Sequence, residues 1–191
     1  YAVEAEPGIA RAMNCGLMMA QGDIIAFLHA DDRYAGASVL TKVAETFREC
    51  PEALWVTGGM KEIDAHGEFL RELPARRFAS SRLLRNNIIY HPATFVKRSV
   101  MAELGGFDES LRFAMDYDLW LRLSALGHPA QCRDCLADFR VHDGSLSSFE
   151  RIKTLEEEYL VRQRHTTNSP SRWLHALYQW LRLSLEKERP G

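Results

Sequence analysis

The chain has 191 residues, of which 46% are hydrophobic and 26% charged, and this balance excludes disorder over most of its length. Lys and Arg number 24 against 26 Asp and Glu, giving a net charge of −2, so bulk attraction to nucleic acid is excluded as the basis of function. No apolar run is long enough to span a bilayer, and residue 1 opens no signal-peptide pattern, so we expect a cytoplasmic protein.

The first half of the chain alternates helical and strand patterns. Apolar residues at helical spacing predict a helix over 9–20 that Gly22 ends. The unbroken apolar run 24–28 predicts a strand buried on both faces, and hence a parallel or mixed sheet covered by helices. We further expect a helix over 39–49 capped by Ser38, a strand over 53–59 broken by Gly58 and Gly59, and a hairpin over 60–73 turned at 65–67.

In the second half, residues 88–97 read as a loop entering a strand, and Ser99 is expected to cap a short helix. A helix over 116–126 has an acidic first turn, and 137–141 is a strand candidate. Cys132 and Cys135 form a single Cys-x-x-Cys pair, which is interpreted as two reduced thiols, with half a zinc site or a redox pair as the alternative.

Residues 150–191 differ in character from the rest. We expect a charged helix over 150–164 and then a second helix to about residue 187 with a wide apolar face that includes Trp173 and Trp180. The chain is therefore divided into a domain over 1–149 and a C-terminal amphipathic helical extension over 150–191. The apolar face is expected to pack on the domain or form a homodimer; the alternative is peripheral contact with the inner face of a membrane.

Asp31 and Asp32 follow the predicted strand 24–28. Ligands in open α/β sheets bind beyond the carboxyl ends of strands, and two adjacent carboxylates there repel each other unless a cation lies between them. Mg²⁺ or Mn²⁺ would suit these oxygen ligands and would bridge to substrate phosphates, whereas a simple turn is the alternative.

Further candidate residues lie at other ends of predicted elements. Asp116 and Asp118 open a helix, and successive helix positions diverge by 100°, so one of the two is expected to face the cleft as a general base. Stabilisation of the helix dipole is the alternative for both. His142 follows the last predicted strand, and a surface histidine is the alternative there.

Several segments together resemble family-2 glycosyltransferases with the GT-A fold. In chain order these are GIARAMNCG at 8–16, AQGDIIAFLHADD at 20–32, HPATFVKRS at 91–99, GGFDE at 105–109, AMDYDLWLR at 114–122, and RVH at 140–142 followed by Ser145 and Ser147. The resemblance runs from residue 7 to about residue 149. It implies an α/β fold: a mixed sheet flanked by helices, here with a C-terminal helical tail.

The resemblance also implies inverting transfer of a sugar from a nucleotide-diphosphate donor to an acceptor hydroxyl of a carbohydrate or lipid-linked acceptor. Asp116 matches the family's base, although Met115 stands where many relatives have Glu. The family's Asp-x-Asp element falls on residues 29–32, with His29 in its first position, so the resemblance assigns the metal, Mn²⁺ or Mg²⁺, to Asp31, Asp32 and His142. The remaining assignments are Arg11, Asn14 and Asp31 on the donor side, and His91 and Asp118 on the acceptor side.

One departure from the family concerns the start of the chain. The family opens with a strand, a helix and a strand that grips the nucleotide base, and this sequence starts downstream of them, so we expect an N-terminally short domain with an open sheet edge. Two alternatives therefore stay open: a non-catalytic remnant that acts as a binding or assembly module, and a metal-dependent hydrolase or nucleotidyl transferase that uses the same carboxylates.

Overall fold

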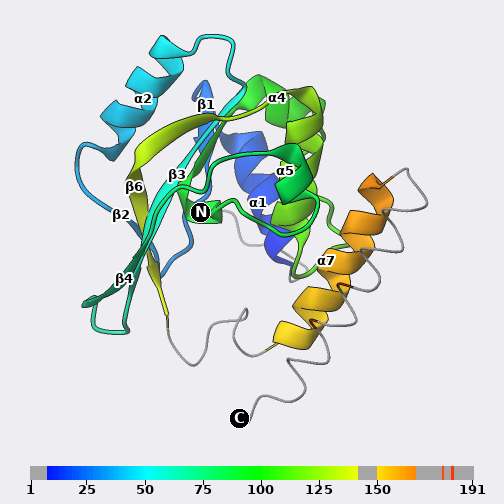
Figure 1. The fold of residues 1–191 in the computed structure, drawn as a ribbon. Coiled ribbons are helices and arrows are strands. Elements are labelled where there is room, and N and C mark those ends of the chain that lie inside the picture. The colour runs from blue at the N-terminus through cyan, green and yellow to red at the C-terminus, as the bar shows by residue number, and fades with distance from the viewer. Residues whose placement is uncertain (1–7, 142–149, 167–177, 179–181, 183–191) are drawn as a thin grey trace.

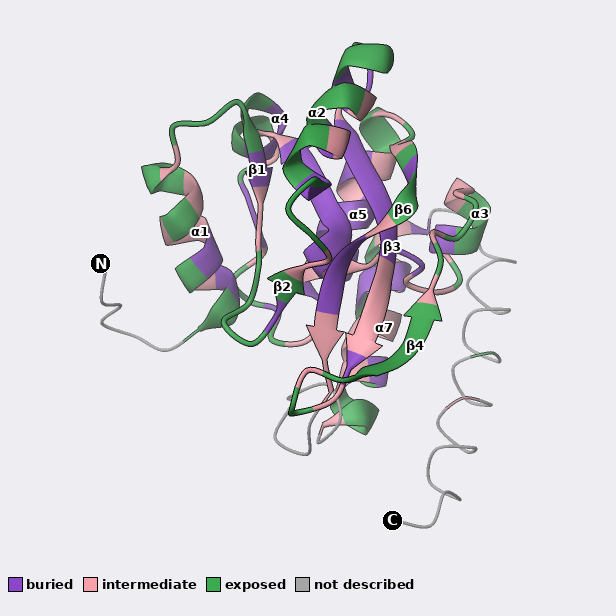
Figure 2. Cartoon of the chain, turned by 90° about the vertical axis from the view of Figure 1, so that its left-hand side faces the viewer, coloured by how far each residue is buried: buried purple, intermediate pink, exposed green. Residues whose placement is uncertain are grey.

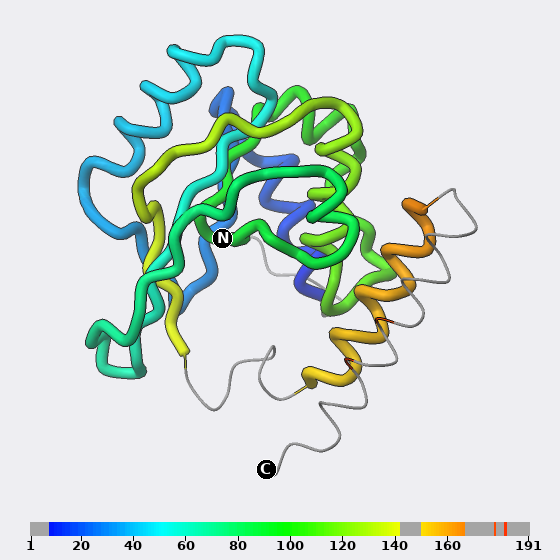
Figure 3. The backbone as a smooth tube through the Cα atoms, in the orientation of Figure 1, coloured from blue at the N-terminus to red at the C-terminus, as the bar shows by residue number. Residues whose placement is uncertain are grey.

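The structure is a computed structural model that describes residues 8–141 and 150–166 together with Tyr178 and Arg182. Figure 1 shows a curled sheet with helices on both sides and α7 (Arg151–His165) on the outside beside α5 (Met115–Leu126). The same path is traced as a tube in Figure 3. The prediction of an α/β fold with a mixed sheet and a helix after it is confirmed.

Within the described residues the sheet has six strands in the order β1-β5-β3-β6-β2, with β4 pairing with β3 off this path. Among the strands of the described residues, only β3 and β6 run parallel, and the other pairs are antiparallel. The strands are β1 (Ile24–Ala26), β2 (Arg33–Tyr34), β3 (Trp55–Ile63), β4 (Phe69–Leu73), β5 (Thr94–Lys97) and β6 (Ala130–Arg140).

Helices cover both faces because neighbouring residues of a strand point to opposite sides. Val56 packs with Val39 and Val43 of α2 (Val39–Glu49), whereas Trp55 packs in the core under α1 (Ile9–Met19), α4 (Arg98–Glu103) and α5. Figure 2 shows the buried middle of β3 and β6 between these layers. The short helices α3 (Ser80–Leu83) and η1 (His91–Ala93) lie in the connection to β5.

Two strand predictions were wrong in detail. The strand after Gly22 is not buried on both faces: β1 is three residues long, lies at the end of the strand order and leaves Ile24 37% exposed. Gly58 and Gly59 do not break a strand, because β3 continues through both. A Cβ at Gly58 would lie 2.6 Å from the Leu136 side chain, so glycine permits the close approach of β6 there.

Other predictions hold with shifted ends. The hairpin turns where expected, with Asp64 Oδ1 accepting the backbone N–H groups of His66 and Glu68 and with Gly67 at φ 91°. Helix α2 has the predicted bounds, but Ser38 makes no capping bond with its side chain. The last strand, β6, begins at Ala130 and so includes Cys132 and Cys135, both free thiols.

The charged helix predicted over 150–164 is confirmed as α7. The second tail helix falls almost wholly outside the described residues; of it, the Tyr178 hydroxyl donates to Asn86 (2.8 Å) and Arg182 Nη1 donates to Glu158 (3.0 Å). None of the described helices is both long and apolar enough to cross a membrane. The division of the chain at residue 149 stays a prediction.

Candidate functional site

Asp116 lies in the first turn of α5 and is half-buried. Its Oδ1 accepts the backbone N–H of Tyr117 (2.6 Å), and its Oδ2 accepts Asn87 Nδ2 (3.2 Å). Burial raises the Asp116 pKa to about 6, and the nearby Glu158 charge adds to this, while the two hydrogen bonds act in the opposite direction. A carboxylate with this pKa is a stronger base than an ordinary Asp and is still ionised at neutral pH.

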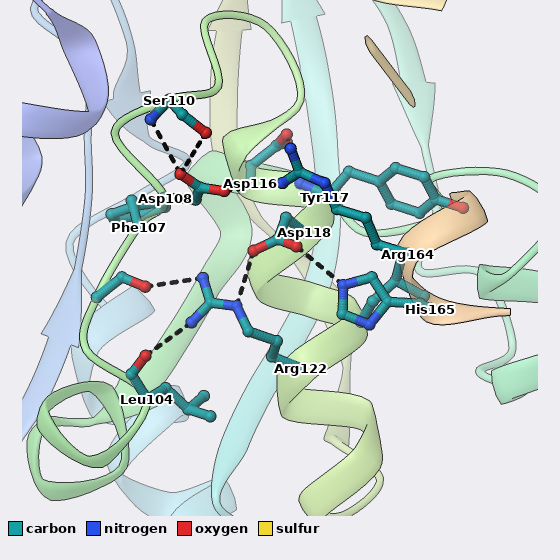
Figure 4. A network of polar contacts seen from close by, with 12 residues as sticks. Leu104, Phe107, Asp108, Ser110, Asp116, Tyr117, Asp118, Arg122, Arg164 and His165 are labelled. Atoms are coloured by element: carbon teal, nitrogen blue, oxygen red, sulfur yellow. Dashed lines mark hydrogen bonds and ion pairs between the residues drawn. The ribbon is translucent and has the colours of Figure 1, made fainter. Parts of the chain in front are cut away.

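Asp118, two positions further along the helix, is buried and has partners on both sides (Figure 4). Its Oδ2 accepts Arg122 Nε (2.7 Å), and His165 of α7 lies 2.8 Å from its Oδ1. Burial alone would raise its pKa, but the hydrogen bond with His165 and the Arg122 charge hold the pKa below the usual value. In the structure Asp118 therefore ties α5 to α7, and its acceptor-side role stays a prediction.

The loop that leads into α5 is held from two directions. Arg122 Nη1 and Nη2 donate to the carbonyl oxygens of Leu104 (2.9 Å) and Gly106 (2.8 Å). From α1, Asn14 Nδ2 donates to the Phe107 carbonyl (2.9 Å), and Asn14 Oδ1 accepts the Phe107 N–H (2.8 Å). Asn14, expected on the donor side, thus braces the loop before α5, while Arg11 lies half-buried on the same helix.

The acidic turn, which carries Asp31 and Asp32, follows β1 and is hydrogen-bonded to the end of β6. Arg140 donates its backbone N–H to Asp32 Oδ1 (3.1 Å) and its Nε to the Asp31 carbonyl (3.0 Å). Burial raises the Asp32 pKa, and the neighbouring Asp31 charge raises it further, whereas the hydrogen bond from the Arg140 N–H lowers it. Asp32 Oδ2 is buried with no hydrogen-bond partner among the described residues, and the Asp31 side chain is exposed.

Aromatic rings connect this turn to α5. The His29 ring lies 5.1 Å from that of His91, which lies 5.9 Å from the Trp120 ring on α5. Burial, with a smaller effect of His29, lowers the His91 pKa to about 3, so His91 is neutral at physiological pH. Its ring also lies near Phe107, at 6.1 Å, so it joins the turn after β1, the loop before α5 and α5 itself.

The acidic turn offers the kind of ligand that a hard cation prefers, carboxylate oxygens, but only a few of them. Mg²⁺ and Mn²⁺ prefer carboxylate oxygens, and Asp32 Oδ2 is a buried oxygen without another partner among the described residues. Within the described part of the chain, no group of three or more His, Cys, Asp or Glu side chains is placed to hold a metal. His142, the third ligand expected from the sequence, lies outside the described residues.

Sequence reasoning missed several residues that shape the site. Asn87, which donates to Asp116, lies in a basic connection without a recognisable pattern. Glu157 and His165 lie on a helix that the sequence marks only as charged, yet both contact the first turn of α5 or the residues before it. No spacing in the sequence relates α7 to α5, and so only the tertiary structure identifies these residues.

A family model described as "Glycosyltransferase like family 2" matches residues 4–165. The chain belongs to this family. An uncharacterized glycosyltransferase of Mycobacterium tuberculosis is 29% identical over 140 residues, covering 71% of this chain and 52% of that protein. The amylovoran biosynthesis glycosyltransferase AmsE of Erwinia amylovora is 27% identical over 129 residues, covering 66% of this chain and 48% of AmsE. The chain thus spans about half the length of these relatives.

Solved structures show the same GT-A fold. The mannosyltransferase PcManGT from Pyrobaculum calidifontis, solved in complex with GDP-Man and Mn²⁺, matches with a TM-score of 0.63 and 18% identity over 91% of this chain and 50% of that one. TarS residues 1–349 from S. aureus, in complex with UDP, match with a TM-score of 0.56 and 17% identity over 86% of this chain and 48% of the TarS chain. The predicted family and fold are confirmed.

Proposed function

We propose that the chain carries the base-bearing part of an inverting glycosyltransferase that moves a sugar from a nucleotide-diphosphate donor to an acceptor hydroxyl. The observation that carries the proposal is Asp116: a half-buried carboxylate in the first turn of α5, with its pKa raised to about 6 and its direction set by Asn87 and the Tyr117 N–H. Membership of the glycosyltransferase-like family 2 supports the reaction class.

The reaction would be a single displacement. Asp116 takes the proton of the acceptor hydroxyl while the oxygen of that hydroxyl bonds to the anomeric carbon, and the bond from that carbon to the diphosphate oxygen breaks on the opposite face. The nucleoside diphosphate leaves with the electron pair, and the anomeric configuration inverts. Charge develops on the leaving diphosphate, and electrostatic stabilisation there has the largest effect on the rate.

Asp31 and Asp32 would hold Mn²⁺ or Mg²⁺, with His142 as the third ligand. The bound cation would supply positive charge next to the diphosphate. Arg140 supports this assignment because its contacts hold the Asp31 carbonyl and Asp32 Oδ1 and leave Asp32 Oδ2 without a partner among the described residues. Arg11 remains our candidate for a direct donor contact, whereas Asn14 would act through the loop that it holds.

On the acceptor side, we propose His91 as a neutral residue whose ring lies 5.9 Å from that of Trp120 on α5, and Asp118 as the residue that sets the orientation of α5. The acceptor is proposed to be a carbohydrate or a lipid-linked carbohydrate, since AmsE and the O-antigen biosynthesis protein RfbC of Myxococcus xanthus carry names from polysaccharide biosynthesis. A cytoplasmic location, with the C-terminal tail at the inner membrane face or in a homodimer, belongs to the same proposal.

The test uses hydrolysis of the donor, in which water replaces the unidentified acceptor. The chain is incubated with Mn²⁺ and GDP-mannose or UDP-sugars, and release of nucleoside diphosphate is measured. Asp116→Asn should lower the rate about 10²- to 10⁴-fold, which is the usual contribution of a general base, while calorimetry shows unchanged donor affinity. Asp134→Asn, at an exposed carboxylate of β6, is the matched control and should leave the rate unchanged. Unchanged hydrolysis in Asp116→Asn would remove Asp116 from the mechanism.

The pH profile gives a second check. Since the base must be ionised, the rate should rise with pH through about 6 and then become constant, and this limb should disappear in the residual activity of Asp116→Asn. A profile that is flat between pH 5 and 8, or a limb that survives in the variant, would contradict the assignment.

The second candidate function is a non-catalytic binding or assembly module. It is favoured by the absence, within the described residues, of a group of three side chains placed to hold a metal ion. Binding of the donor without any release of nucleoside diphosphate, in wild type and variants alike, would support this module and contradict the transferase.

A further inference from the structure

Helix α5, which carries Asp116, begins without a capping side chain of its own. Ala114 is the residue before the helix, and its methyl group accepts no hydrogen bond. The first N–H groups of a helix lack partners within it, so they need acceptors from elsewhere. Glu157 of α7 acts one step earlier in the chain, on the three residues that lead into the helix: its carboxylate accepts the backbone N–H groups of Arg112 (3.0 Å), Phe113 (2.5 Å) and Ala114 (2.6 Å).

The same side of α7 makes a second contact with this loop. Arg164 lies seven residues after Glu157, which is close to two helical turns, so both side chains point the same way. Arg164 Nη1 donates to Asp108 Oδ2 (2.9 Å), and the adjacent His165 lies 2.8 Å from Asp118 (Figure 4). Helix α7 therefore holds residues 108–114 at both ends.

Asp116 lies midway between two residues attached to α7. Ala114 is bonded to Glu157 two positions earlier, and Asp118 is bonded to His165 two positions later. We infer that Glu157 is a positioning residue for Asp116, acting through the backbone of residues 112–114 to set where the base points. This inference rests on the proposed function, in which Asp116 is the base.

Substitutions at Glu157 should have graded effects because three N–H groups share its two charged oxygens. Hydrogen bonds to a charged acceptor are roughly twice as strong as neutral ones. Glu157→Gln keeps one acceptor oxygen without the charge, and Glu157→Ala keeps none. Glu156→Gln is the matched control, because Glu156 is exposed on the same helix.

The experiment measures donor hydrolysis and donor affinity for the chain with Mn²⁺ and GDP-mannose or a UDP-sugar. Glu157→Ala should lower the rate at saturating donor at least about tenfold, because a small misplacement of a catalytic group can cost up to about a hundredfold. Donor affinity should stay within about twofold, Glu157→Gln should be intermediate, and Glu156→Gln should match the wild type. In hydrogen exchange, the Phe113 and Ala114 amides should lose protection in Glu157→Ala.

Two results would overturn the inference: a wild-type rate in Glu157→Ala, or a lower rate explained wholly by weaker donor binding or by unfolding. If Glu157→Ala does not fold, the same criteria apply to Glu157→Gln. If the wild type hydrolyses no donor, the proposed function fails. The positioning of Asp116 by Glu157 is then tested by the Asp116 pKa, measured by NMR titration of its ¹³C-labelled carboxyl group. Its pKa should then fall from about 6 toward 3.8 in Glu157→Ala and not in Glu156→Gln, and an unmoved pKa would contradict positioning.

Discussion

The two acidic regions of the molecule are built differently. At the start of α5, both oxygens of Asp116 and both of Asp118 have partners from the chain itself, and Asp118 is only 5% exposed. In the turn after β1, the Asp31 side chain is exposed, and one buried oxygen of Asp32 has no partner among the described residues.

This difference matches two kinds of chemical task. A base must be aimed before the substrate arrives, because its contribution depends on orientation, so it gains from a rigid set of partners. A metal-binding carboxylate must keep an oxygen available, and Arg140 holds the acidic turn through the Asp31 carbonyl and Asp32 Oδ1 without contacting Asp32 Oδ2. The comparison implies that substitutions in the turn change ligand binding, whereas those around α5 change stability and turnover.

The largest effect is expected at Asp32. Asp32→Asn removes the charge from the buried oxygen but keeps the shape, so Mn²⁺ affinity should fall more than about 100-fold, beyond the usual loss for a residue that only orients a ligand. Asp23→Asn, at an exposed carboxylate before β1, is the control and should change Mn²⁺ affinity little. Calorimetric titration with Mn²⁺ measures both variants. Equal affinity in Asp32→Asn and wild type would place the metal elsewhere.

The next effect concerns the cost of holding Asp116 ionised. Because its pKa is raised from 3.8 to about 6 in the folded state, the folded chain binds more protons than the unfolded chain between these values. Stability should therefore fall as pH rises through this window and stay constant above it.

Asp116→Asn should abolish that fall. Between pH 3 and pH 8, the free energy of unfolding of the variant should therefore rise relative to that of the wild type by at most about 3 kcal/mol. Urea unfolding at the two pH values measures the difference, with Asp23→Asn, at an exposed carboxylate before β1, as the control. If the difference in unfolding free energy between variant and wild type does not change with pH, burial does not raise the Asp116 pKa.

A smaller effect separates two neighbouring glycines before α5. Gly105 and Gly106 both have positive φ, at 74° and 73°, so alanine costs about 1–2 kcal/mol at either position. A Cβ at Gly106 would also lie 2.4 Å from Asn14 Oδ1, whereas at Gly105 it would meet nothing within 4 Å. Gly106→Ala should thus lose about 1–2 kcal/mol more than Gly105→Ala in urea unfolding, because it disturbs the Asn14 hydrogen bonds. Equal losses would mean that Asn14 does not hold the loop.

The sequence allowed the fold class, the hairpin and most helices to be predicted, because periodicity and glycine placement are local signals. It failed at β1 and at Gly58, where the outcome depends on which strands become neighbours. The candidate site divides in the same way. Motif order led to Asp31, Asp32 and Asp116 as candidates, which stay predictions, but the contacts of Asn87 and Glu157 depend on tertiary packing that no spacing encodes.

Spectroscopy with Mn²⁺ tests most directly whether the two acidic regions serve one reaction. The paramagnetic ion broadens NMR signals only of nearby nuclei, so titration of the ¹⁵N-labelled chain with Mn²⁺ reports distance to the metal. The account predicts that the amides of Asp32 and Asp116 broaden together at low Mn²⁺, while that of Leu40 on α2 stays sharp. Broadening at Asp32 without any at Asp116 would contradict a shared site.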